Sequence, residues 1–404
     1  MPHLSRRFAS VGALLLLALA GCAAPPPPSD STAAPESDAH GRIDGAAELA
    51  EPALGLTSID AGGRVSHLDL LDETTAELGV VRAPAAVHSD GRYLFSVDGD
   101  GVSIVDSGVW TWDHVDHFHY YRAPARVLGD IAGEGVATIA TSNSSTTGGA
   151  GVFFPGSGEA VLLDIEALSK GEVVEKFRVT TTSGAGLVAP VGSFAAVAAG
   201  GEVTLRAADG APLGASTPCI DPAGTITTRV GAVIGCRDGA VLASVEGDQP
   251  VVEVVPYPPG TTAPRATAFH NREGRPRVAA LAGDAGIWIL DTRARTWTLL
   301  PAPEPLVQVT AVDDKTANVL ALSAGGRVLT LDGDSGAVRA ASVPLVSESL
   351  AAGLPVTLVA DQQRAYLNGP AEGRLWEIDF ADGARIAREF TPERSPLFFA
   401  ETGR

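Results

Sequence analysis

Three histidines lie within six positions of a chain that has eight histidines in 404 residues. They are His114, His117 and His119, and Asp113 and Asp116 stand among them. Imidazole nitrogens and carboxylate oxygens are ligands that Zn(II) accepts in tetrahedral sites. The density of these groups in a histidine-poor chain predicts a divalent transition-metal site. The alternative is a polar, aromatic-rich loop that binds no metal.

The spacing of these residues sets a geometric condition on such a site. Successive side chains of a strand point to opposite faces, so His117 and His119 share one face. His114 and Asp116 would point to the other face, and a turn or bulge before His117 is needed to bring three rings together. Asp116 or Asp113 then completes four-coordination. Alternatively, a distant histidine supplies the fourth ligand, although packing or loop roles compete for each candidate: His67, His88 and His270.

The cluster follows an expected strand, Gly101–Asp106, and precedes Arg126–Leu128, which we expect to open the next structural repeat. It should therefore occupy an outer strand or a connecting loop. Neighbouring aromatic side chains should pack on the strand faces and limit the access of water to the metal. These aromatic residues are Trp110, Trp112, Phe118, Tyr120 and Tyr121.

The first residues have the features of an export signal. Two arginines precede a short apolar stretch that ends in Leu19-Ala20-Gly21-Cys22, which resembles a bacterial lipobox. We expect residues 1–21 to be a lipoprotein signal peptide. Residues 22–52 would be a lipidated Cys22 followed by a flexible Pro/Ser/Ala-rich stalk, and residues 53–404 one folded domain. The protein would then be anchored by lipid on the extracytoplasmic face of the membrane; an ordinary secretory signal is the alternative.

Cysteine usage and charge agree with an exported protein. Besides Cys22, the chain has Cys219 and Cys236, and an even pair in an exported chain predicts a disulfide. A thiolate metal site competes with this interpretation, but the close paired spacing of zinc ribbons is missing. The formal net charge of −19 and the lack of basic clusters exclude nucleic acid as a partner. We expect a monomer that meets the membrane through its lipid alone.

Short runs of Val, Leu, Ile and Ala, separated by Gly, Asp and Pro, indicate an all-β chain. Helical periodicity is confined to Ile165–Lys170. A strand couplet recurs along the chain at the spacing of propeller blades, and we predict a β-propeller of eight blades, with seven as the second choice. Pairing of the N- and C-terminal strands should close the ring. The clearest couplets start at Arg92, Arg277, Ala317 and Arg364.

The segment Asp106–Tyr121 resembles the AztD-type zinc metallochaperones, and Arg277–Asp291 and the cysteine-bracketed hairpin are similar to that family too. The resemblance covers most of the chain after the stalk and implies a β-propeller that delivers zinc to the solute-binding protein of a zinc-import ABC transporter. It also implies zinc binding through His114, His117 and His119 with an aspartate nearby. The chain departs from the family in having no histidine in Ile220–Gly224 and no histidine-rich N-terminal arm, so the resemblance does not extend to a second zinc site or to arm-assisted transfer.

Two other functions remain open. The chain could be a surface lipoprotein whose propeller binds another protein without metal, because a fold does not fix a function. A zinc held by three imidazoles and a water could instead be hydrolytic. The cluster contains no glutamate that could act as a general base and the chain has no HExxH motif, so we expect a protein that is not an enzyme.

Overall fold

The computed structural model describes residues 41–113 and 117–404, and strands account for most of their regular structure. The two helices of this part, α1 (Ile165–Ser169) and α2 (Ser347–Ala351), are five residues long each. Helix α1 lies where the sequence has helical periodicity. The side chain of Asp164 caps it by accepting a hydrogen bond from the backbone N–H of Glu166.

The strands pair into antiparallel sheets, most of them four-stranded, in which strands that follow one another in the chain are usually neighbours. The first sheet holds β5 (Ala86–Ser89), β6 (Tyr93–Val97), β7 (Gly101–Asp106) and β10 (Arg126–Ala132). The second and third sheets hold β11 (Thr138–Thr141), β12 (Gly149–Phe154), β13 (Glu159–Asp164) and β14 (Glu175–Thr180), then β15 (Gly186–Val191), β16 (Phe194–Ala199), β17 (Glu202–Arg206) and β18 (Pro212–Pro218).

The following sheets repeat this pattern. They hold β19 (Thr225–Thr228), β20 (Gly231–Cys236), β21 (Gly239–Glu246) and β22 (Gln249–Pro256); β23 (Arg277–Leu281), β24 (Ile287–Asp291) and β25 (Thr296–Leu300); β26 (Leu306–Ala311), β27 (Asn318–Ser323), β28 (Val328–Asp332) and β29 (Val338–Ala341); and β30 (Leu358–Ala360), β31 (Ala365–Gly369), β32 (Arg374–Asp379) and β33 (Arg385–Phe390). The couplets expected from the sequence are confirmed as the antiparallel pairs β6–β7, β23–β24, β27–β28 and β31–β32.

The last sheet joins the two ends of the described chain. Its strands are β2 (Gly55–Ile59), β3 (Arg64–Asp69), β4 (Thr75–Val80) and β34 (Phe398–Thr402). Strand β2 pairs with β34 over its whole length, and the hydroxyls of Thr57 and Thr402 lie 3.1 Å apart across that pair. The early and terminal segments therefore share a sheet, as the sequence predicts.

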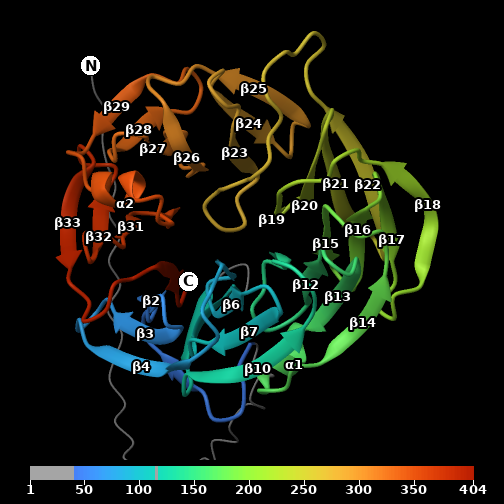
Figure 1. Ribbon diagram of the computed structural model, residues 1–404, viewed down its shortest axis with the longest axis horizontal. Helices are drawn as coiled ribbons and strands as arrows, with labels where there is room; N and C mark the ends of the chain where they lie inside the picture. Colours follow the sequence, from blue (N-terminus) through green and yellow to red (C-terminus); the bar gives the residue numbers. More distant parts are fainter. Residues whose placement is uncertain (1–40, 114–116) are drawn as a thin grey trace, which may run out of the picture. The chain divides into compact units, whose positions relative to one another are not determined.

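Neighbouring sheets bury their faces against each other. One core cluster combines Phe95 and Ile104 of the first sheet with Val152 and Val161 of the second, and all four side chains are fully buried. Figure 1 shows the sheets of the described chain following one another around a central region. There the structure has a cavity of about 410 Å³, lined by residues of β5, β11, β19, β26, β30 and β34. This arrangement agrees with the all-β, propeller-like fold expected from the repeats.

Cys219 and Cys236 form the predicted disulfide, and both lie in the core shared by the third and fourth sheets. No helix among residues 41–113 and 117–404 combines the length and the apolar content needed to cross a membrane.

Candidate metal site

His117 and His119 belong to a hairpin inserted between two strands of one sheet. Strand β8 (Val109–Asp113) follows β7 and pairs with β9 (Phe118–Arg122), and the chain then enters β10. The expectation that Arg126–Leu128 opens the next repeat is wrong. These residues begin β10, which pairs with β7 as the fourth strand of the same sheet, because the hairpin leaves and re-enters at the edge of β7.

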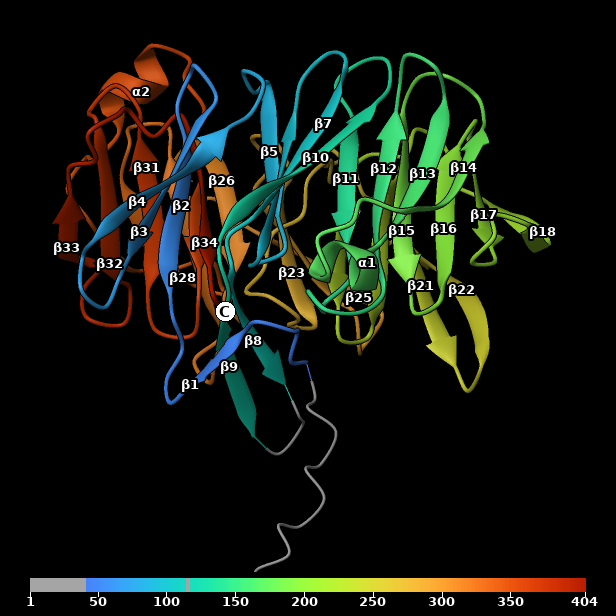
Figure 2. The same ribbon diagram turned by 90° about the horizontal axis from the view of Figure 1, so that it is seen from below.

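The hairpin forms a small sheet of its own. Its third strand is β1 (Ala47–Leu49), which pairs with β9. We refer to β1, β8 and β9 as the hairpin sheet, and Figure 2 shows it extending from one face of the surrounding sheets. Strand β1 lies within residues 22–52, the segment expected to be a stalk, so part of that segment is ordered against the hairpin.

Asp113 and Phe118 are paired across β8 and β9, so the chain reverses direction between them. His114 and Asp116 lie outside the described residues. Asp113 is exposed at the end of β8.

His119 of β9 and His117, which directly precedes β9, approach each other. Their Nε2 atoms are 2.9 Å apart and their ring centroids 4.7 Å apart. Two nitrogens bound to one tetrahedral zinc, each about 2.0–2.1 Å from the metal, lie about 3.3 Å apart. A zinc ion could therefore bind between these two nitrogens after a small outward shift of the rings and loss of the proton that one Nε2 donates to the other.

Glu48 of β1 contacts His119 on the opposite side of the ring from His117. Its Oε1 is 2.7 Å from Nδ1 of His119. A carboxylate only accepts hydrogen bonds, so Nδ1 carries a proton and Nε2 of the neutral ring carries the lone pair that a metal needs. Carboxylate–histidine pairs of this kind orient metal ligands in proteins. The sequence reasoning missed Glu48 because it lies 71 positions from His119. The available signal was the pair of apolar residues Ile43 and Leu49, which indicates that this part of the expected stalk packs against the folded domain.

An aromatic face supports the two histidines. Trp110 and Tyr121 are paired across β8 and β9, as are Trp112 and His119, and directly paired residues share a face of a sheet. The ring of Tyr121 stacks on Trp110 at 5.3 Å and lies nearly parallel to His119 at 6.1 Å. Phe118 differs from the expectation, since 55% of its surface is exposed.

A buried ion pair holds this face to the first sheet. Arg92 donates two hydrogen bonds to the carboxylate of Asp106, of 2.9 and 2.8 Å, and both side chains are 1% exposed. The guanidinium carbon of Arg92 also lies 3.9 Å from the ring centroid of Trp110. At the base of the hairpin, the backbone N–H of Ala123 donates to the carbonyl of Gly108. The hairpin is thus fixed at its base, whereas Asp113, His117 and Phe118, farthest from the base among its described residues, are exposed.

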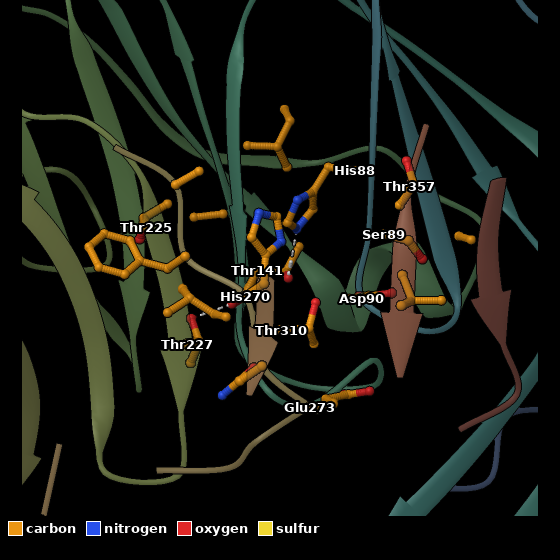
Figure 3. A pocket seen from close by; sticks show the side chains of 18 of the residues that line it. His88, Ser89, Asp90, Thr141, Thr225, Thr227, His270, Glu273, Thr310 and Thr357 are labelled. Atoms are coloured by element: carbon orange, nitrogen blue, oxygen red, sulfur yellow. Dashed lines mark hydrogen bonds between the residues drawn. The ribbon is translucent and has the colours of Figure 1, made fainter. Parts of the chain in front are cut away.

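The distant histidines lie elsewhere in the fold. His88 and His270 line the central cavity, where Figure 3 shows their rings close together. Burial lowers the pKa of each ring to about 4, so both are neutral at pH 7. Nε2 of His88 is 3.3 Å from the hydroxyl of Thr141. His67 in β3 is hydrogen-bonded to Thr57 at 2.9 Å, and burial lowers its pKa. None of these three residues lies on the hairpin sheet.

Within residues 41–113 and 117–404, no three or more His, Cys, Asp or Glu side chains are grouped so that they could hold a metal ion. Of the residues expected to bind metal, the described part of the chain brings together His117 and His119.

Comparison with known proteins shows the fold. No protein-family model and no curated protein matches the sequence. Among solved structures, the crystal structure of AztD from Citrobacter koseri superposes with a TM-score of 0.74 at 18% identity, covering 88% of this chain and 99% of that one. The structure of apo AztD from the same organism covers 87% and 98%, again with a TM-score of 0.74 and 18% identity. The chain has the fold of AztD. A computationally designed protein, Ika8, matches less well, with a TM-score of 0.50 at 13% identity over 79% of this chain and 91% of its own. The resemblance to AztD that the sequence suggests is thus confirmed for the fold.

Proposed function

We propose that this protein is an extracytoplasmic zinc carrier, tethered by lipid on Cys22, that passes Zn(II) to the solute-binding protein of a zinc-import ABC transporter. The observation that carries the proposal is the approach of the Nε2 atoms of His117 and His119 to 2.9 Å at the exposed end of a hairpin. His114 and either Asp116 or Asp113 would complete the site. The AztD fold supports the same function.

The position of the site suits a carrier. His117 is exposed and His119 half-buried, on a sheet that extends from one face of the described chain (Figure 2). Nitrogen and oxygen ligands at such a place can leave the metal one at a time, so an acceptor can replace them in steps. A carrier also needs no general base, and we propose that the protein is not an enzyme.

The propeller itself would be an eight-bladed ring. Apart from the hairpin sheet, the described residues form eight sheets, and the β2–β34 pair joins the two ends of the series. This count favours eight blades over seven. A ring closed in this way buries the sheet edges at the chain ends and gives the hairpin a rigid base.

The test is zinc stoichiometry and competitive chelator titration on residues 23–404, a form that keeps β1. One tightly bound zinc per chain, passed to the transporter's zinc-free solute-binding protein faster than it is lost to a chelator, is the expected result. A protein that takes up no zinc would overturn the proposal. Equal binding of the solute-binding protein with and without zinc would favour the alternative, a docking protein that uses no metal.

A further inference from the structure

Residues 41–49, which we call the strap, lie over the aromatic face of the hairpin. The indole N–H of Trp110 donates a 3.1 Å hydrogen bond to the carbonyl of Gly41. Gly41 packs so closely on Trp112 that a Cβ at this position would lie 2.3 Å from Cγ of the indole. Ala46 is buried in one cluster with Trp110 and Tyr121, against which Ile43 also packs. The strap therefore covers the side of the hairpin that carries His119.

The strap ends in β1, whose register places Glu48 at the metal site. Glu48 is paired with Tyr121, so its side chain lies on the same face as Tyr121 and as His119 two residues earlier. The diagonal step from Glu48 to His119 gives the 2.7 Å contact between Oε1 and Nδ1. Because β1 is three residues long and lies at the edge of its sheet, the strap has few interactions to lose. Segments of this kind open at a lower free energy than the core.

We propose that Glu48 is a positioning residue for His119 and that tight zinc binding requires the strap to be seated, an inference that rests on the proposed function. With the strap seated, Glu48 holds the Nδ1 proton of His119 and turns Nε2 toward His117. When the strap is displaced, His119 loses this partner and the covering of its aromatic neighbours. The protein then keeps both imidazoles but holds zinc less tightly.

The first experiment compares the zinc affinity of Glu48→Ala and Glu48→Gln with that of the unmodified protein by chelator competition. Removing a carboxylate that orients a metal-binding histidine typically lowers metal affinity about 10–100-fold. We expect a loss in this range for Glu48→Ala and a smaller loss for Glu48→Gln, whose amide oxygen still accepts the Nδ1 proton. Glu51→Ala, which changes an exposed glutamate just after the strap, is the matched control. Equal affinities of Glu48→Ala and Glu51→Ala would overturn the proposal.

A second measurement tests the positioning role without zinc. Nitrogen-15 NMR of the ring nitrogens of His119 reports which one carries the proton. We expect the Nδ1–H form in the unmodified protein and a mixture of tautomers in Glu48→Ala, a change that a purely structural role of β1 would not produce. An unchanged tautomer would contradict the positioning role. If the unmodified protein binds no zinc, the proposed function fails, whereas this measurement still decides the role of Glu48.

The strap itself is tested by Ala46→Gln, which places a larger polar side chain against Trp110 and Tyr121. This variant should lower zinc affinity as Glu48→Ala does, because both changes remove Glu48 from His119. The variant that combines Ala46→Gln with Glu48→Ala should bind zinc as tightly as whichever single variant has the lower zinc affinity. Changes that act through one contact are not additive. Fully additive losses, or an Ala46→Gln protein with unchanged affinity, would show that seating of the strap does not control the site.

Discussion

At the scale of single residues, the candidate site depends on which nitrogen of an imidazole faces the metal. His117 directly precedes β9 and His119 lies in it, and their Nε2 atoms approach to 2.9 Å. Glu48 determines the proton position on His119 from the opposite side of the ring. One local pattern thus supplies two ligands, and a residue far away in the sequence orients one of them.

Replacing both His117 and His119 by alanine should lower zinc affinity by more than about 100-fold, beyond the loss expected for a residue that only orients a ligand. The fold should remain intact, because both side chains lie on the exposed part of the hairpin. Chelator competition and circular dichroism measure the two effects. His88→Gln, which changes a histidine of the central cavity, is the control and should keep its affinity. Unchanged zinc uptake by the double variant would place the site elsewhere.

At the scale of elements, the hairpin sheet is rigid at its base because a buried charge pair supports it. Arg92, which directly precedes β6, binds Asp106 at the end of β7 and also packs on Trp110 of β8. The desolvation of both charges is offset by two hydrogen bonds and by the aromatic ring. The first sheet and the hairpin sheet are therefore coupled through one guanidinium group.

Arg92→Met should lower the free energy of unfolding by about 3–5 kcal/mol, because it leaves the Asp106 carboxylate buried without its partner. Arg92→Met combined with Asp106→Leu should recover much of this loss, since no buried charge remains. Urea denaturation measures both. As a control, Lys170→Ala breaks an exposed ion pair with Glu166 and should change stability far less. A single variant as stable as the unmodified protein would contradict the structural role of the pair.

At the scale of the whole molecule, the cavity and the disulfide lie among the packed sheets, and no residue of either belongs to the hairpin sheet. The disulfide joins two cysteines 17 positions apart, on a segment that runs from the end of the third sheet into the fourth. The cavity contains His88 and His270, which were candidate ligands from the sequence but line a different region. Stability and zinc binding should therefore respond to different substitutions.

Replacing Cys219 and Cys236 together by serine should lower the free energy of unfolding by about 3 kcal/mol, because the unfolded chain gains the freedom that the cross-link removes. Zinc affinity should not change, since neither residue lies on the hairpin sheet. Thermal unfolding and chelator competition test the two statements. Added reductant should destabilise the unmodified protein and leave the variant unaffected; a variant that loses zinc would contradict the separation of the two regions.

The buried histidines predict a loss of stability in acid. In the folded protein the pKa of His88 and of His270 is lowered from 6.5 to about 4, so between these pH values the unfolded chain binds more protons. Stability should fall as the pH drops from 6.5 to 4, on the order of 3 kcal/mol per ring at 1.36 kcal/mol per pKa unit. His88→Gln combined with His270→Gln should lose less stability over this range in urea denaturation. Parallel pH curves for the two proteins would contradict the prediction.

Much of the fold was predictable because it follows local rules. Alternating apolar runs and Gly/Asp turns predicted the pairs β6–β7 and β31–β32, and the cysteine pair in an exported chain predicted the disulfide. The sequence wrongly predicts that β10 opens the next sheet. No local pattern shows that the chain returns to the edge of β7 after the β8–β9 hairpin. The order of strands across such an insertion depends on packing between distant residues.

The sequence by itself determined the strand couplets, the disulfide and the closeness of His117 to His119, because each depends on residues close together in the chain or on a composition that an exported protein requires. The tertiary structure alone decided that residues 41–49 cover the hairpin, that Glu48 meets His119 and that Arg92 supports Trp110. These contacts join segments that the pairing and packing of strands bring together. Neither the periodicity of a segment nor a motif predicts which of many compatible distant residues a side chain will contact.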